Sequence, residues 1–212
     1  GLYRLQKFDF RTLGMHWQLH KGGAEHWRRN DEQSRRMEVA IAIGADPTLM
    51  YAASAPLPPD IDEMVFAGFL RGQPVETVKA KTVDIHVPAH AEIVLEGHLH
   101  EGKVKDEGPF GEWTGYYGSR MRAEPVMEIK AIYYRNNPIL TCAASQKPPH
   151  SHLFERCFIR SAGLLDSLEG AGIPDVKGVW VHQAGSGRTF VAVSIKQRYF
   201  GHANQVGLVA SQ

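Results

Sequence analysis

The stretch from residue 75 to residue 143 constrains the fold most, because it is a succession of short β-type runs separated by turn signals. The candidate strands cover residues 75–80, 82–87, 92–100, 126–135 and 139–143. The tripeptide Asn136-Asn137-Pro138 marks a turn between the last two runs. Several strands joined by short turns favour an antiparallel sheet or a barrel over a doubly wound α/β sheet.

Helices and further strands are expected before this stretch. Residues 3–10 form a candidate strand, residues 20–36 a charged helix without proline, and residues 39–44 a short apolar strand of the buried type. Residues 61–70 follow two prolines, begin with acidic side chains and end at Gly72, a pattern that predicts a helix.

The character of the chain changes at Lys147-Pro148-Pro149. Beyond this point we expect a helix at residues 152–168, a strand pair at 176–183 and 189–197, and a helix from about Ala203. The fold class predicted for the whole chain is therefore α+β, with a β-rich core and flanking helices.

Composition excludes several classes of protein. The chain has 212 residues and a net charge of +1, which gives no electrostatic case for nucleic acid or an anionic membrane surface. No apolar run approaches the roughly 20 residues of a membrane span. The two cysteines favour a reduced, cytoplasmic setting over a disulfide framework. The chain has no initiator Met and starts in a strand-like run, so we expect an internal piece of a longer protein.

Two acids, Glu107 and Glu112, flank the bend Gly108-Pro109-Phe110-Gly111. Glycine permits backbone dihedral angles that other residues avoid and proline fixes one of them, so the bend should hold the two carboxylates in a defined relation. Paired acids in different environments can separate a proton donor from its orienting partner. The alternative is a polar surface turn.

Histidine is abundant, with eleven residues, and it is the commonest metal ligand. His16 and His20 have the i, i+4 spacing that places two side chains on one helical face. Glu does not follow His16, so the zinc protease pattern is absent. Two interpretations are open. Either at least one of the two histidines binds a metal, or they are histidines hydrogen-bonded to the backbone. Glu63 is either a helix-capping acid or a metal ligand.

Two cations stand in positions that suit ligand binding. Arg4 lies in an apolar and aromatic strand, where it either points to water or clamps a carboxylate. Lys196 ends a strand just before a helix, a common place to hold a phosphate. The dinucleotide fingerprint, the phosphate loop and the Gly-x-Ser-x-Gly elbow are all absent from the sequence.

Several motifs together resemble the UbiD family of prenylated-flavin-dependent decarboxylases, along most of the chain. The most specific is Glu107-Gly108-Pro109-Phe110-Gly111-Glu112, followed by Thr114-Gly115-Tyr116. Further similar segments are the starting tetrapeptide ending in Arg4, residues 14–24, residues 55–72 and residues 195–203.

The resemblance implies roles for individual residues. Arg4, Glu107 and Glu112 would form the catalytic network, and His20 and Glu63 would bind a divalent metal, normally manganese. The residues that would contact the cofactor, prenylated FMN, are Arg4, Gln18, Leu19, His20 and Lys196. A potassium site near Ala53 and Ser54 follows from the same analogy. The family's asparagine metal ligand would precede Gly1.

The resemblance also implies a fold and a function. It implies a split-barrel, flavin-reductase-like core at residues 1–147 that binds the cofactor, and a continuation at 148–212 toward a C-terminal domain. The activity would be reversible non-oxidative decarboxylation of an aromatic or α,β-unsaturated acid. Partners would be a flavin prenyltransferase and further copies of the chain, as a dimer or a hexamer of dimers. His150 and His152 stand where some members have an acidic pair, which indicates a different substrate acid.

Three alternatives remain at this point. A metalloenzyme of another kind would be built on His16 and His20. An ordinary FMN oxidoreductase would use the split barrel. A non-catalytic cofactor-binding or assembly fragment would perform no chemistry. Flavin absorption and metal content of the full-length protein distinguish them.

Overall fold

The computed structural model describes residues 1–17, 22–33, 35–55, 57, 61–112, 115–142 and 152–212. These residues divide into two compact units. The first unit comprises Gly1–Phe110 and Tyr117–Thr141, and the second comprises Gly111–Tyr116 and Cys142–Gln212. Each unit has its own apolar core, so each is described by itself.

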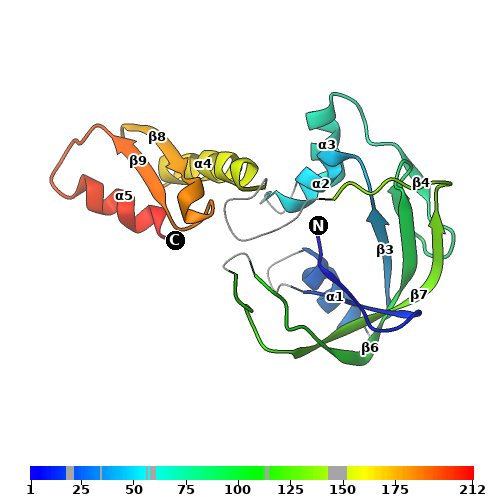
Figure 1. Ribbon diagram of the computed structural model, residues 1–212. Helices are drawn as coiled ribbons and strands as arrows, with labels where there is room; N and C mark the ends of the chain where they lie inside the picture. The colour runs from blue at the N-terminus through cyan, green and yellow to red at the C-terminus, as the bar shows by residue number, and fades with distance from the viewer. Residues whose placement is uncertain (18–21, 34, 56, 58–60, 113–114, 143–151) are drawn as a thin grey trace. The chain divides into compact units, whose positions relative to one another are not determined.

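The first unit is built on a five-stranded antiparallel sheet in the order β1-β2-β7-β6-β3. The strands are β1 (Leu5–Lys7), β2 (Thr12–Met15), β3 (Met37–Ile43), β6 (Ile93–Glu107) and β7 (Arg122–Tyr134). Figure 1 shows the long pair β6 and β7 as a strongly curved ribbon. Two short strands, β4 (Thr77–Lys79) and β5 (His86–Pro88), form a separate hairpin.

Two irregularities in the β6–β7 ladder accompany this curvature, one at Glu96/Gly97 and one between Leu99 and Val104. A Cβ atom at Gly97 would lie 2.0 Å from the carbonyl oxygen of Glu128, so only glycine fits this close approach of the two backbones. The bulge allows β6 to continue to Glu107, where the strand ends.

The main core of the first unit lies on one face of this sheet. Leu99 and Met127 are fully buried at its centre, with Met15, Trp17 and Leu13 beside them. Helix α1 (Gly22–Asp31) contributes Ala24 to the same cluster. Apolar side chains alternate along β2 and β7, so one face of each strand packs into this core.

A buried carboxylate anchors the loop between β4 and β5. Glu96 is fully buried and accepts hydrogen bonds from the backbone N–H groups of Lys81 at 2.7 Å and Thr82 at 2.5 Å, and from the Thr82 hydroxyl at 2.6 Å. Burial raises the pKa of this carboxyl, but the hydrogen bonds outweigh burial and lower the pKa to about 2.

Two further helices belong to this unit, α2 (Pro47–Ser54) and α3 (Glu63–Arg71). The Asp62 side chain caps α3 by accepting from the N–H groups of Met64 and Val65, and Gly72 ends it in the left-handed conformation. The predicted helix at 61–70 is confirmed with these signals. Helix α2 was not predicted, although Asp46 caps it and Pro47 opens it.

The second unit is a helix–strand–strand–helix arrangement, as the sequence predicts. Helix α4 (His152–Gly170) precedes the antiparallel pair β8 (Val176–Val181) and β9 (Val191–Ile195), and α5 (His202–Ala210) follows. A short 3-10 turn, η1 (Gln183–Gly185), lies between the strands. Leu168, Ile173 and Val206 form the core that joins the helices to the strand pair.

The sequence prediction differs from the structure in several places. The strand expected at 3–10 is reduced to β1, the one expected at 82–87 to β5, and residues 139–142 form no strand. The mixed fold with a sheet-rich core and flanking helices is confirmed. The split-barrel, flavin-reductase-like part of the prediction is not, because the described strands form an open sheet whose edges are β1 and β3. No described helix is both long and apolar enough to span a bilayer.

The Glu96 anchor gives a test of this fold. We expect Glu96→Gln to lower the free energy of unfolding by about 2–3 kcal/mol at pH 7, because the amide nitrogen cannot accept the N–H groups of the loop. The folded-state pKa lies below the unfolded value, so the stabilisation exists above about pH 4.5 and is lost toward about pH 2. Denaturant unfolding at both pH values measures the difference. Glu76→Gln, at an exposed acid, is the control, and an equal loss in both variants would contradict the assignment.

Candidate active site

The acidic bend begins where β6 ends. Gly108 follows Glu107 with a φ of 91°, a conformation that only glycine adopts readily, and the Gly108–Pro109 peptide bond is cis. The backbone N–H of Gly108 donates to the side-chain oxygen of Gln6 at 2.8 Å. The loop is therefore tied to the start of the chain, which carries Arg4.

Glu107 is the most buried acid of this bend, with 2% of its surface exposed. Its Oε2 lies 3.1 Å from Nδ1 of His16. Its Oε1 is buried and has no hydrogen-bond partner among the residues that the structure describes. A Cβ atom at Gly14 would lie 2.8 Å from that oxygen, so a larger residue there would displace it. Most buried polar atoms are hydrogen-bonded, so this oxygen requires an explanation, and a functional role is one.

The surroundings of Glu107 raise the pKa of its carboxyl above the ordinary value. Burial raises the pKa of the Glu107 carboxyl, and the nearby Glu124 adds to this effect. His16 and Arg122 act in the opposite direction. Arg122 lies opposite Glu107 in the β6–β7 ladder, pairs with Glu124 and donates to the carbonyl of Trp17 at 2.8 Å.

Arg4 and His16 meet on either side of one aromatic ring. The guanidinium carbon of Arg4 lies 4.9 Å from the ring centre of Phe110, in a cation–π contact. The same ring meets the imidazole of His16 edge-on, at 5.4 Å between centroids and 83° between planes. The backbone N–H of His16 also donates to the carbonyl of Arg4 at 3.0 Å. Arg4 and Glu107 thus share the neighbours His16 and Phe110.

The second acid of the bend, Glu112, belongs to the second unit. It is half-buried, and its backbone N–H donates to the carbonyl of Tyr116 at 2.8 Å. Burial and the neighbouring Arg160 and Arg156 lower the pKa of Arg188, and the charge of Glu112 acts in the opposite direction. Glu112 therefore lies near enough to Arg188 for their charges to interact.

The residues expected to hold a metal are only partly described. Glu63 is the first residue of α3, and its Oε1 lies 3.5 Å from the amino nitrogen of Gly1. Gln18, Leu19 and His20 lie outside the described residues. Among the residues that are described, no three His, Cys, Asp or Glu side chains gather into a metal-binding group. Near the suggested potassium site, the Ala53 carbonyl accepts from the N–H of Leu2 at 3.0 Å.

Lys196 follows directly after β9 in the second unit. Its side chain is exposed, and its backbone N–H donates to the carbonyl of Asp175 at 3.0 Å. The chain then passes through a loop to Gly201, which precedes α5. The ammonium group is accessible, as contact with a bound phosphate requires.

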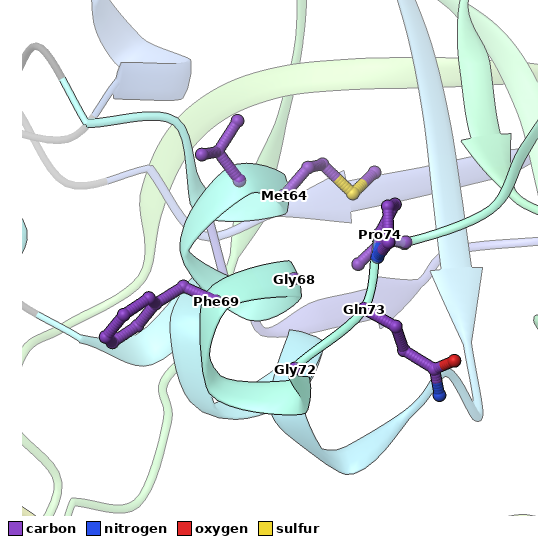
Figure 2. A pocket seen from close by; sticks show the side chains of 8 residues that line it. Met64, Gly68, Phe69, Gly72, Gln73 and Pro74 are labelled. Carbon is purple, nitrogen blue, oxygen red and sulfur yellow. The ribbon is translucent and has the colours of Figure 1, made fainter.

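A separate hollow lies along α3 and the segment that follows it. Figure 2 shows Met64, Gly68, Phe69, Gly72, Gln73 and Pro74 around it. Its lining contains no acid, base or nucleophile, so the hollow itself offers no chemistry. The chemically equipped part of the first unit is the group around Glu107.

Sequence reasoning missed three members of that group: Gly14, Phe110 and the His16–Glu107 contact. His16 was considered only as a metal ligand or a histidine bonded to the backbone. Recognising residues 5–15 as a β-hairpin could have placed His16, because β1 pairs with β2 and Gln6 lies opposite Gly14. Extending that register by two residues places His16 beside Arg4, as the backbone hydrogen bond shows.

Two family models match this chain, one over its first part and one over its last part. The model of the 3-octaprenyl-4-hydroxybenzoate carboxy-lyase Rift-related domain matches residues 1–148, and that of the C-terminal domain matches residues 155–212. An uncharacterized protein of Archaeoglobus fulgidus is 42% identical over 212 residues. The alignment covers 97% of this chain and 42% of that relative, so the chain spans less than half of the relative's length.

Solved structures agree with this assignment. The UbiD-class enzyme HmfF from Pelotomaculum thermopropionicum, in complex with prFMN, is 34% identical with a TM-score of 0.84, over 98% of this chain and 48% of that one. The vanillic acid decarboxylase of Sedimentibacter hydroxybenzoicus is 31% identical with a TM-score of 0.80, over 98% and 43%. Because the two family models together cover nearly the whole chain, it belongs to the UbiD family.

Proposed function

We propose that the protein containing this chain is a carboxy-lyase that catalyses the reversible, non-oxidative decarboxylation of an aromatic or α,β-unsaturated carboxylic acid. The proposed cofactors are prenylated FMN and a divalent metal, manganese by resemblance to the family. The solved relatives that bind prFMN and FMN support a flavin cofactor.

One observation carries the proposal: a carboxylate buried at the end of β6 keeps one oxygen without a partner among the described residues, and the histidine bonded to its other oxygen contacts Arg4. Glu107 is 2% exposed, and Arg4 shares its neighbours Phe110 and His16. Desolvating a carboxylate and leaving half of it unsatisfied costs stability. A site that binds and orients a charged substrate gives a reason for that cost.

The residues present suit the proposed cofactors. Glu63 lies in the first turn of α3 and offers a carboxylate. One carboxylate and the imidazole of His20 would supply oxygen and nitrogen ligands, which manganese accepts. Lys196 would contact the flavin, and Gln18 and Leu19 would lie against it, by resemblance to the family. Prenylated FMN would supply an electron-accepting ring that takes up the charge released when carbon dioxide leaves.

The chain's own groups would bind the substrate and move one proton. Arg4 would hold the substrate carboxylate through the paired N–H groups of its guanidinium. Glu107, as an anion, would orient Arg4. In the decarboxylation direction the C–C bond breaks, carbon dioxide leaves, and the carbon takes a proton from the carboxyl group of Glu112.

Glu112 can act as that donor only if it is protonated when the carbon accepts the proton. Exclusion of water by a bound substrate and cofactor would favour the protonated carboxyl. We therefore infer that Glu112 becomes an effective acid only in the complex with cofactor and substrate. Phe110 assists by covering the guanidinium of Arg4 on one side.

The proposed substrate class follows the relatives. The description of the family model names a 3-octaprenyl-4-hydroxybenzoate carboxy-lyase, and one solved relative is a vanillic acid decarboxylase, so we favour an aromatic acid. His150 and His152 are candidates for contacts that set the substrate's ring substituents, by comparison with the acidic pair of some members.

The remaining proposals concern partners. Residues 1–147 would carry most of the cofactor site, and residues 148–212 would continue toward a C-terminal domain. The full protein would form a dimer or a hexamer of dimers, and a flavin prenyltransferase would supply its cofactor. A potassium ion near Ala53 and Ser54 is part of the same proposal.

The activity can be tested with the full-length protein produced together with a flavin prenyltransferase. We expect release of carbon dioxide from at least one member of a panel of hydroxybenzoic, furoic and cinnamic acids. In deuterated water, the product should carry deuterium at the carbon that lost the carboxyl group. Bound prenylated FMN and metal without decarboxylation or exchange of any panel member would contradict the proposal.

The role of Glu112 gives a second prediction. We expect Glu112→Gln to retain flavin and metal while turnover falls by at least about 100-fold, because the amide cannot donate the proton. Visible absorption of the purified variant and single-turnover kinetics provide the measurement. Asp106→Asn, at the neighbouring exposed acid before Glu107, is the matched control and should keep normal activity. Near-normal turnover of the Glu112 variant would refute the assignment.

The proposed metal ligand gives a third prediction. We expect Glu63→Gln to weaken manganese binding to the full-length protein by at least about tenfold, because it removes a charged ligand. Helix α3 should stay folded, since Asp62 provides its cap. Metal analysis after dialysis measures the effect, with Glu76→Gln as an exposed-acid control. Equal metal retention in both variants would exclude Glu63 as a ligand.

A further inference from the structure

His16 makes two specific contacts that a structural histidine in this place does not need. Its Nδ1 lies 3.1 Å from Glu107 Oε2, and its ring edge packs against Phe110. The side chain of Glu107 is 1% exposed and that of His16 18% exposed, so the hydrogen bond is largely shielded from water. A hydrogen bond in such a setting is stronger than one at the surface.

The hydrogen bond between His16 and Glu107 requires a proton on one of the two groups. An ionised carboxylate has no proton to donate, so an anionic Glu107 requires a proton on Nδ1 of His16. A neutral Glu107 would instead donate its own proton to Nδ1. At least one proton therefore lies between the two groups, and the partner that carries it decides whether Glu107 is charged.

Two charged groups of β7 also act on this carboxylate. On the facing strand β7, Arg122 favours the anion and Glu124 opposes it. Arg122 is already engaged with Glu124 and with the Trp17 carbonyl. On the N-terminal side, Arg4 contacts the shared ring of Phe110. His16 is the group whose hydrogen bond to Glu107 the structure provides.

We propose that His16 is a positioning residue for Glu107: it donates Nδ1–H to Oε2, holds Glu107 as an anion, and keeps Oε1 directed toward the donor that completes the site. This inference rests on the proposed function, in which the anion of Glu107 orients Arg4. It gives His16 a role distinct from metal binding, which the spacing of His16 and His20 alone had suggested.

The direction of the resulting pH effect is fixed. Burial already raises the pKa of Glu107, and His16 counteracts this. Without the imidazole, Glu107 should therefore stay protonated up to a higher pH. We expect His16→Leu to move the titration of Glu107 upward by about one to two pH units. His16→Asn should move it less, because its side-chain amide can still donate but cannot carry a charge.

The first experiment uses infrared spectroscopy on the full-length apoprotein between about pH 4 and 9, a range that begins near the ordinary pKa of a glutamate and extends above it. The C=O stretch of a buried protonated carboxyl is assigned to Glu107 by its loss in Glu107→Gln. We expect the midpoint to rise in the order wild type, His16→Asn, His16→Leu. His26→Leu, at an exposed histidine of α1, is the matched control and should behave like the wild type. An unchanged midpoint in both His16 variants would overturn the inference.

The second experiment follows kcat against pH in the flavin-loaded enzyme. The acidic limb should move upward with His16→Leu, and kcat should approach the wild-type value at high pH, where Glu107 ionises without assistance. A uniform loss at all pH values, or loss of metal with an unchanged Glu107 titration, would also overturn the inference. Failure of the proposed function is distinguishable, because it would leave the infrared shift in place while the wild type decarboxylates nothing.

Discussion

The burial of the Glu107 carboxylate is the constraint on which the first unit depends. A carboxylate removed from water needs donors or a proton, and the groups around this one come from segments distant in sequence. Gly14 leaves room for it, His16 contacts one of its oxygens, and Arg122 faces it from β7. The curved β6–β7 pair, made possible by the bulge at Gly97, carries the strand to this point. The contacts that build the fold in this region are therefore also the contacts that surround the Glu107 carboxylate.

A second glutamate on the same strand shows what a purely structural carboxylate looks like. Glu96 accepts three hydrogen bonds from the loop at residues 81–82, and its pKa falls to about 2. Glu107 has His16 and an oxygen without a partner among the described residues, and its pKa is raised. The same side chain, buried to a similar degree, has both oxygens hydrogen-bonded in one place and only one in the other. This contrast separates the anchor from the candidate site.

Local signals predicted local structure well. The acidic residues before α3 and Gly72 after it set that helix, and the pattern after residue 150 predicted α4, β8, β9 and α5. The bend after Glu107 was visible because glycine and proline restrict the backbone directly. The strand order and the His16–Glu107 contact were not predictable, since they join residues 91 positions apart through the pairing of β2 with β7 and β7 with β6. The roles that the family motifs imply for Arg4, Glu107 and Glu112 stay predictions, and those motifs did not point to the contact between His16 and Glu107.

The proposed function requires one guanidinium and two carboxylates, those of Arg4, Glu107 and Glu112, to act together beside an electron-accepting ring. A crystal structure of the full-length protein with bound prenylated FMN tests it most directly, through the distances among Arg4, Glu107 and Glu112. The account predicts Arg4 within hydrogen-bond reach, about 3 Å, of the Glu107 carboxylate, with Glu112 facing the flavin in the same cavity. Side chains separated by bulk water, or a flavin bound away from them, would contradict it.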